Sequence, residues 1–169
     1  ILSADHGVDA APEFYLQKGL TDTGRIDMPE IISTVNEALK KRYGIDDALI
    51  IDFWNPGLFF DLKKIRELGL DVEEVEGIVS TLIESMPGFI TALRRTDLLK
   101  GETPDTPVIK KVIRGFHPER SGNVIVVQDK HWLLDRTPGL LTAMHGSPHD
   151  YDTHVPMFFA GPGITAQTI

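Results

Sequence analysis

Two long stretches of the chain repeat apolar residues every three or four positions, which is the spacing of a helix with one buried face. These stretches are residues 28–43 and 72–86. The first is preceded by Asp27, which with Glu30 resembles a capping box, and it is followed by Gly44, a residue type that commonly ends helices. The sequence therefore predicts two amphipathic helices, each of which buries one face.

Shorter apolar runs between and after these helices have the length of strands. A hairpin is predicted over residues 48–62, because two apolar runs flank the turn sequence Asn-Pro-Gly. The other runs predict a strand over 89–95, a helix from Pro107 to about Phe116, a strand over 123–128 and an extended segment over 131–135. The resulting β-β-α-β-α-β order predicts a small sheet with helices on one face, resembling a ferredoxin-like α+β unit.

The two ends of the chain carry apolar segments outside this unit. Residues 1–2 look like the end of a buried strand that runs into a polar loop over 7–26, and residues 155–164 look like a core strand followed by a loop. We expect the two strands to pair in one sheet. This organisation assigns residues 1–44 and 135–169 to a catalytic core and residues 45–134 to an inserted α+β cap.

Composition narrows the possible partners. The chain has 169 residues, 41% of them hydrophobic and 25% charged, which suits a globular domain. Its 17 Lys and Arg against 25 Asp and Glu give a net charge of −8, so a nucleic-acid polymer is not an expected partner. There is no Cys, so any metal site must use His, Asp and Glu. No apolar run has the length of a membrane-spanning helix, so no membrane span is expected.

Asp5 and His6, in the sequence Ala-Asp-His-Gly, follow the apparent first strand. In open α/β sheets, sites form beyond the carboxyl ends of strands, which is where this pair is expected. An adjacent carboxylate and imidazole can turn toward one cation, and both ligand types suit zinc; Gly7 would permit a tight backbone turn beside them. A surface turn held by an Asx hydrogen bond explains the same residues as well.

The sequence HGSPHDYDTHVP, near the other end, holds three of the chain's six histidines. His154 precedes an apolar run and so lies at the expected edge of a sheet, a good position for a metal ligand. His145 and His149 are interpreted as residues that order the loop by hydrogen bonds or face solvent, in preference to metal ligands. Asp150 and Asp152 are interpreted as turn formers or hydrogen-bond partners of His154.

The segment SADHG, followed far downstream by HGSPxxYDTHVPMFFAGPGI, resembles the alkaline phosphatase superfamily. The resemblance is to its nucleotide pyrophosphatase/phosphodiesterase-like branch, which includes bacterial alkaline phosphatases with a single Thr nucleophile. The segments GLDVEEVEGIV and MPGFITALRRTDLLKG are similar to the insertion between these motifs in that family. The resemblance implies an α/β fold, namely part of an α/β/α sandwich with an inserted ferredoxin-like α+β cap.

The same resemblance implies a phosphohydrolase with two divalent metal ions, usually Zn²⁺, that acts on a small phosphate ester. By motif match, Asp5 and His6 would ligate one ion and His154 the other. In such a site, two ions clamp the phosphoryl oxygens, and a covalent phospho-enzyme intermediate is hydrolysed. The resemblance also implies a periplasmic or secreted location.

Several features of the family cannot be matched in this sequence. The Thr or Ser nucleophile, an Asp near the start and an Asp-x-x-x-His ligand pair all precede the DHG motif in family members. The chain also begins without an initiator Met or a signal peptide. We therefore expect it to be the C-terminal part of a catalytic domain, without a catalytic nucleophile and inactive alone, with the N-terminal half of the same domain as its partner.

Two other interpretations remain open. The chain could be a non-catalytic α+β binding module in which the motifs of Asp5, His6 and His154 are vestigial. It could also be part of a related superfamily member, such as a phosphoglycerate mutase or a sulfatase, although the second motif fits sulfatases less well. The sequence does not distinguish phosphate monoesters from diesters, because the residues that select between them are expected upstream.

Overall fold

The computed structural model describes residues 1–165, and its longest helix is the one that the apolar spacing predicts. Helix α2 spans Met28–Tyr43. At its start, the side chain of Asp27 accepts a hydrogen bond from the backbone N–H of Glu30 at 2.9 Å. At its end, Gly44 takes the left-handed conformation, with φ of 66°. Both predicted helix boundaries are confirmed, because cap chemistry is local to the sequence.

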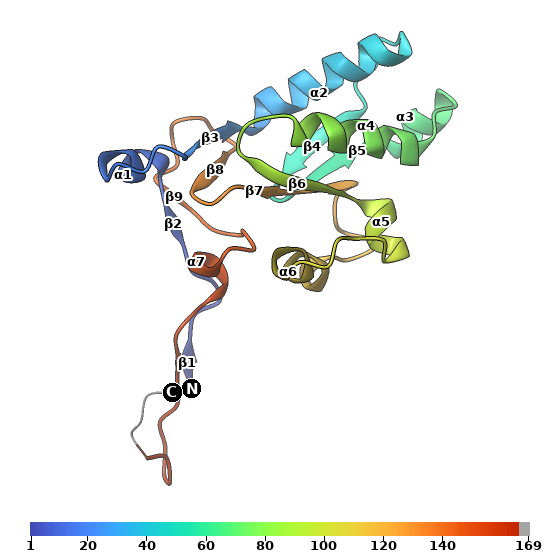
Figure 1. The fold of residues 1–169 in the computed structure, drawn as a ribbon. Helices are drawn as coiled ribbons and strands as arrows, with labels where there is room; N and C mark the ends of the chain where they lie inside the picture. The colour runs from blue at the N-terminus through green and yellow to red at the C-terminus, as the bar shows by residue number, and fades with distance from the viewer. Residues whose placement is uncertain (166–169) are drawn as a thin grey trace.

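A four-stranded antiparallel sheet forms the centre of the molecule (Figure 1). Strand β4 pairs with β5, β5 with β7, and β7 with β6. The hairpin of β4 and β5, the strand β6 and the strand β7 all lie where the sequence predicts them. Their bounds are Ile50–Trp54 for β4, Gly57–Phe60 for β5, Phe89–Arg94 for β6 and Val124–Gln128 for β7.

One face of this sheet is covered by α2, α3 (Leu62–Glu67) and α4 (Val72–Glu84). Strand β7 contributes Val124 and Val126 to the core between them. The helices contribute side chains with no exposed surface, namely Val35, Leu39, Ile65, Val75, Val79 and Ile83. This core holds most of the buried apolar surface of the described chain.

The other face of the sheet is also covered by helices, which corrects the prediction of helices on one face. Leu93 and Ile125 point away from the main core and pack with Ile109 in a second cluster. Ile109 belongs to α6 (Pro107–Gly115), and α5 (Arg95–Lys100) lies beside it. Strand β7 is apolar at its first four positions and buried throughout, which explains the second layer, because a strand whose two faces are both apolar needs cover on both.

The predicted loop over residues 7–26 is not continuous, because residues 9–27 contain regular elements. These elements are β2 (Asp9–Ala10), α1 (Pro12–Gln17) and β3 (Gly24–Asp27). Strand β3 pairs in parallel with β8 (Trp132–Asp135), and β2 pairs with β9 (Ala143–Met144). Strand pairing with distant partners stabilises these short elements, and the local sequence carries no sign of those partners.

The two ends of the described chain form a separate ribbon that projects from this body (Figure 1). Strand β1 (Leu2–Ser3) pairs with β10 (Met157–Phe158), so the predicted pairing of the two ends is confirmed. Their predicted burial is wrong: the exposed fractions are 67% for Leu2, 61% for Met157 and 59% for Phe158. Within residues 1–165 each strand pairs only with the other, so no second layer covers the ribbon.

The mixed α/β class predicted from the sequence is confirmed. The division into a core and a cap stays a prediction, and α2, assigned to the core, packs its apolar face on the sheet of residues 45–134. In the part of the chain that the structure describes, no helix is both long enough and apolar enough to cross a lipid bilayer.

Candidate metal centre

The ribbon brings the two predicted metal motifs side by side. Beyond β1, the backbone N–H of Gly7 donates to the carbonyl oxygen of Asp152 at 2.8 Å. Asp152 belongs to α7 (Asp150–Thr153), the single helical turn that precedes His154. A Cβ atom on Gly7 would lie 1.8 Å from the carbonyl oxygen of Tyr151, so the close approach of the two segments requires glycine.

The geometry of Asp5 and His6 suits the binding of one cation. His6 Nδ1 lies 2.7 Å from the carbonyl oxygen of Gly7. A carbonyl can only accept, so Nδ1 carries the proton and Nε2 presents its lone pair. His6 Nε2 lies 3.6 Å from Asp5 Oδ2. Two ligand atoms at tetrahedral zinc distances are about 3.3 Å apart, so small side-chain adjustments would let this pair share a zinc ion.

Both side chains are open to solvent, as a metal entering the site requires. The Asp5 side chain is 88% exposed and that of His6 is 40% exposed. The ring of His145 stacks on that of His6, with centroids 3.6 Å apart and planes 12° apart. His145 therefore holds the His6 ring in place, a role that the sequence did not indicate.

His149 and Asp152 hold the loop that precedes His154. His149 is buried, and its Nε2 lies 2.8 Å from the carbonyl oxygen of Gln128, which it must face as a donor. Asp152 is also buried, and its Oδ2 accepts from the backbone N–H of Ser147 at 2.7 Å. The interpretation of His149 as a residue that orders the loop is therefore confirmed.

A lysine from α6 fixes the outer side of the same loop. Lys111 Nζ lies 2.7 Å from Asp150 Oδ1 and 2.9 Å from Thr153 Oγ1. The hydrogen bond and charge of Lys111 lower the pKa of Asp150 below its usual value. Asp150 thus forms an ion pair with a residue of α6. This ion pair orients the Asp150 side chain, in place of the predicted contact with His154.

His154 follows α7 directly, and its backbone N–H donates to the carbonyl oxygen of Asp150 at 2.8 Å. Its side chain is exposed. In residues 1–165, no three side chains of the His, Cys, Asp and Glu types converge closely enough to hold a metal ion. The structure therefore unites Asp5 with His6 and sets His154 on the adjoining segment, while the assignment of all three as metal ligands stays a prediction.

A second polar cluster, absent from the sequence-based expectations, lies between β2 and the body. The hydroxyl of Tyr15 donates to Asp9 Oδ1, and Asp9 Oδ2 lies 3.0 Å from His131 Nδ1. Burial, followed by the hydrogen bond to Asp9, raises the pKa of Tyr15 to about 12. Pro12, at the first position of α1, was the local signal for the helix that carries Tyr15.

Known proteins are similar to this chain in sequence and in fold. No protein-family model matches the chain. Among curated relatives, a protein of Myroides odoratus named as a calcium-transporting ATPase is 27% identical over 96% of this chain. The alkaline phosphatase PafA of Elizabethkingia meningoseptica is 28% identical over 96% of this chain. The crystal structure of alkaline phosphatase PafA superposes on 91% of this chain with a TM-score of 0.75 and 24% identity.

The match runs through nearly the whole of this chain, whereas it covers a limited part of each relative. The chain spans 29% of the length of the first two curated relatives and 28% of the PafA structure. Alkaline phosphatases of Synechococcus elongatus and of a Sphingomonas species match over similar shares. These matches, together with the shared fold, show that nearly the whole chain is similar in sequence and in structure to part of the alkaline phosphatases.

Proposed function

We propose that this chain supplies part of the active site of a metal-dependent enzyme that hydrolyses phosphate esters. The observation that carries the proposal is the geometry of Asp5 and His6, whose ligand atoms lie 3.6 Å apart with His6 Nε2 free to accept. The similarity to alkaline phosphatases supports a phosphatase-type reaction. The alternative of a vestigial binding module has no comparable feature in its favour.

In this proposal, Asp5 and His6 hold one divalent ion and His154 holds a second, with Zn²⁺ as the expected metal. Two such ions, when bound, stabilise charge on the attacking and leaving oxygens of the phosphoryl group. The chain's own residues orient the ligands. His145 stacks on His6, Gly7 bonds to the segment that leads to His154, and His149 anchors that segment to β7.

In this proposal, the remaining parts of the active site come from outside these 169 residues. They are a Thr or Ser nucleophile and the other metal ligands, as the resemblance to the nucleotide pyrophosphatase/phosphodiesterase-like branch implies. The substrate is a small phosphate ester, and the location is periplasmic or secreted. The N-terminal part of the domain is then the structural partner of the exposed ribbon of β1 and β10.

The test is made in a full-length phosphatase that contains this chain. His154→Ala should lower phosphate-ester hydrolysis by about a thousandfold, because one of two cooperating ions loses a ligand. His117→Ala, outside the proposed site, should leave turnover unchanged. His149→Ala should reduce the amount of folded protein and leave turnover per folded molecule within about threefold. A His117→Ala defect as deep as that of His154→Ala would refute the assignment.

The isolated 169-residue chain gives a second test. It should hydrolyse nitrophenyl phosphate no faster than buffer with the same zinc, since its nucleophile is proposed to lie elsewhere. Its zinc affinity, measured by calorimetry, should be weak, because Asp5 and His6 supply two of the three or four protein ligands that zinc usually takes. Tight binding of two zinc ions, or turnover by the chain alone, would contradict the proposed ligand set.

A further inference from the structure

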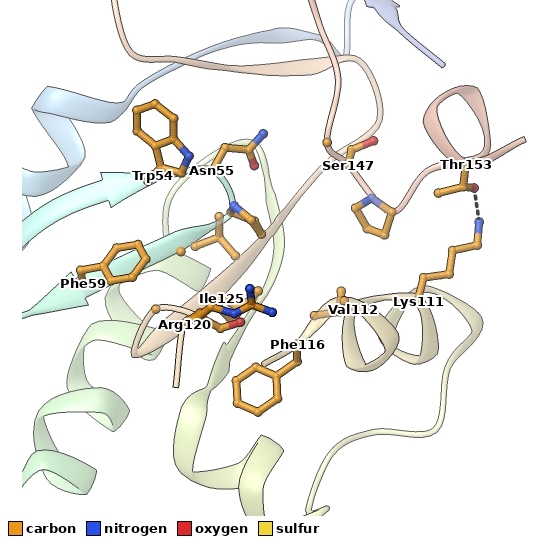
Figure 2. A pocket seen from close by; sticks show the side chains of 18 residues that line it. Trp54, Asn55, Phe59, Lys111, Val112, Phe116, Arg120, Ile125, Ser147 and Thr153 are labelled. Carbon is orange, nitrogen blue, oxygen red and sulfur yellow. Dashed lines mark hydrogen bonds between the residues drawn. The ribbon is translucent and has the colours of Figure 1, made fainter. Parts of the chain in front are cut away.

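A cavity of about 370 Å³ lies apart from the proposed metal ligands. Its walls come from the turn of the β4–β5 hairpin, from α6, and from the loop of residues 146–153 (Figure 2). Cavities of about 300–1,000 Å³ are typical of small-molecule sites. Asp5, His6 and His154 do not line it, so any ligand there would occupy a site distinct from the proposed metal centre.

The walls of the cavity offer flat apolar surfaces. Trp54, Phe59 and Phe116 line it from different elements (Figure 2). The ring of Trp54 is held by Arg136, whose guanidinium carbon lies 4.6 Å from the ring centroid. Aromatic walls of this kind favour planar rings, which stack or pack edge-on against them.

The charge of the cavity is opposite to that of the chain. The chain carries a net charge of −8, yet among the described residues the charged groups that line the cavity are Lys111 and Arg120, both cationic. The ammonium group of Lys111 already donates to Asp150 and Thr153. The side chain of Arg120 makes no hydrogen bond or ion pair with any residue in 1–165, and Figure 2 shows it extending among the other lining residues. A guanidinium in this position is suited to a phosphate-type or carboxylate anion.

A polar group on the hairpin turn completes the cavity and connects it to the metal motif. Asn55 Nδ2 donates to the carbonyl oxygen of His145 at 3.2 Å. Asn55 Oδ1 is buried and has no partner within the described residues, so it can accept a bond from a ligand hydroxyl or N–H. Through His145, which stacks on His6, the turn and the metal motif are joined.

We propose that this cavity binds a small aromatic anion, with its ring against Trp54, Phe59 and Phe116 and its anionic group on Arg120. This ligand class follows from the combination of aromatic walls with a cation that has no acidic partner in the described chain. The proposal does not depend on the proposed hydrolysis, because it concerns binding to residues outside the metal motifs. A ligand in this cavity would also contact Ser147, Pro148 and Thr153, and so would stabilise the loop that leads to His154.

Phenylphosphonate is a suitable probe, because it pairs a ring with a phosphate-like anion and has no ester bond to hydrolyse. Titration of the 169-residue chain is followed by NMR of the indole and backbone N–H groups. We expect Trp54 and the residues around Arg120 to shift, with a Kd of about 1 mM or tighter. The indole of Trp132, which lies outside the cavity, should not shift. Methylphosphonate, which lacks the ring, and benzyl alcohol, which lacks the charge, should each bind at least about tenfold more weakly.

Substitutions at two exposed arginines separate a specific site from general charge attraction. Arg120→Gln should weaken phenylphosphonate binding about tenfold, and Arg120→Lys should weaken it less, because the charge remains without the planar fork. Arg114→Gln, on α6 outside the cavity, is the matched control and should have no effect. Equal losses from Arg120→Gln and Arg114→Gln, equal binding of methylphosphonate, or an unmoved Trp54 signal would each overturn the proposal.

Discussion

Apolar residues are buried in the four-stranded sheet with its helices, whereas they are exposed in the two-stranded ribbon at the chain ends. In the sheet unit, apolar side chains from α2, α3 and α4 close over one face and those of α5 and α6 close over the other. In the ribbon, Leu2, Met157 and Phe158 are more than half exposed. The two regions contain similar apolar residues, and they differ in the number of layers that cover those residues.

The comparison indicates that the sheet unit carries the stability of this chain, and the ribbon carries the proposed metal chemistry. A fully buried aliphatic side chain contributes about 1.5–3 kcal/mol, whereas one that remains exposed contributes little. The ribbon places Asp5 and His6 beside the segment of His154 by backbone pairing, without a core of its own within residues 1–165. Substitutions should therefore affect stability in one region and function in the other.

The largest expected contrast in stability is between two leucines. Leu39→Ala should lower the free energy of unfolding by about 3–4 kcal/mol, because Leu39 has no exposed surface in the main core. Leu2→Ala, in the ribbon, should change it by less than about 0.5 kcal/mol. Urea denaturation of the 169-residue chain measures both. A loss from Leu2→Ala comparable to that from Leu39→Ala would show that the ribbon is covered in solution.

An ion pair between β3 and β8, outside the ribbon, should give the next largest effect. Arg25 Nη1 donates to Asp135 Oδ2 at 2.8 Å, and the side chain of Asp135 has no exposed surface. Arg25→Ala leaves that carboxylate buried without its cation, so we expect a loss of about 3 kcal/mol in urea denaturation. Lys63→Ala breaks the exposed pair with Glu67 and should cost less than about 1 kcal/mol. Similar losses from the two variants would argue against a buried pair.

The cap of α2 should contribute a smaller amount. Asp27→Ala removes the side chain that accepts from Glu30 N–H, and we expect a loss of about 1 kcal/mol in the free energy of unfolding. Asp27→Asn retains an acceptor and should lose less. Asp22→Ala, at an exposed position outside any helix, is the control and should change stability by less than about 0.5 kcal/mol.

The smallest effect concerns the pH dependence contributed by Tyr15. Its pKa is raised to about 12 in the folded chain, so the folded state binds the phenol proton more tightly than the unfolded state does. The stabilisation is therefore fully present below pH about 10 and is lost as the pH rises toward about 12. Ultraviolet titration should show one tyrosine ionising near pH 12, and Tyr15→Phe should remove it. An unchanged titration curve in Tyr15→Phe would exclude this assignment.

The sequence predicted the sheet unit well because its signals are local. The apolar spacing of α2 with the caps at Asp27 and Gly44, and the two apolar runs around Asn55-Pro56, each carry their own structure. The pairing of β1 with β10 was also predicted, since both motifs abut apolar runs. For the candidate site, the sequence indicated the loop-ordering role of His149, while its assignment of Asp5, His6 and His154 as metal ligands stays a prediction.

Other features could not be predicted because their partners are distant in the chain. Strand β3 forms against β8, more than a hundred residues away, and β2 forms against β9. The stacking of His145 on His6 and the Tyr15–Asp9–His131 cluster likewise join residues from opposite ends of the chain. Such contacts leave no periodicity or cap in the local sequence.

The sequence by itself determined the three longest helices, α2, α4 and α6, and the β4–β5 hairpin, and it determined which residue types are present to bind a metal. Periodicity, caps and turn residues act over a few neighbouring positions, so they can be read without the rest of the molecule. The tertiary structure alone decided which apolar strands are covered, which histidine supports His6 and where the aromatic cavity forms. Burial and side-chain convergence depend on segments that meet only after the chain has folded, and so they are properties of the packed molecule.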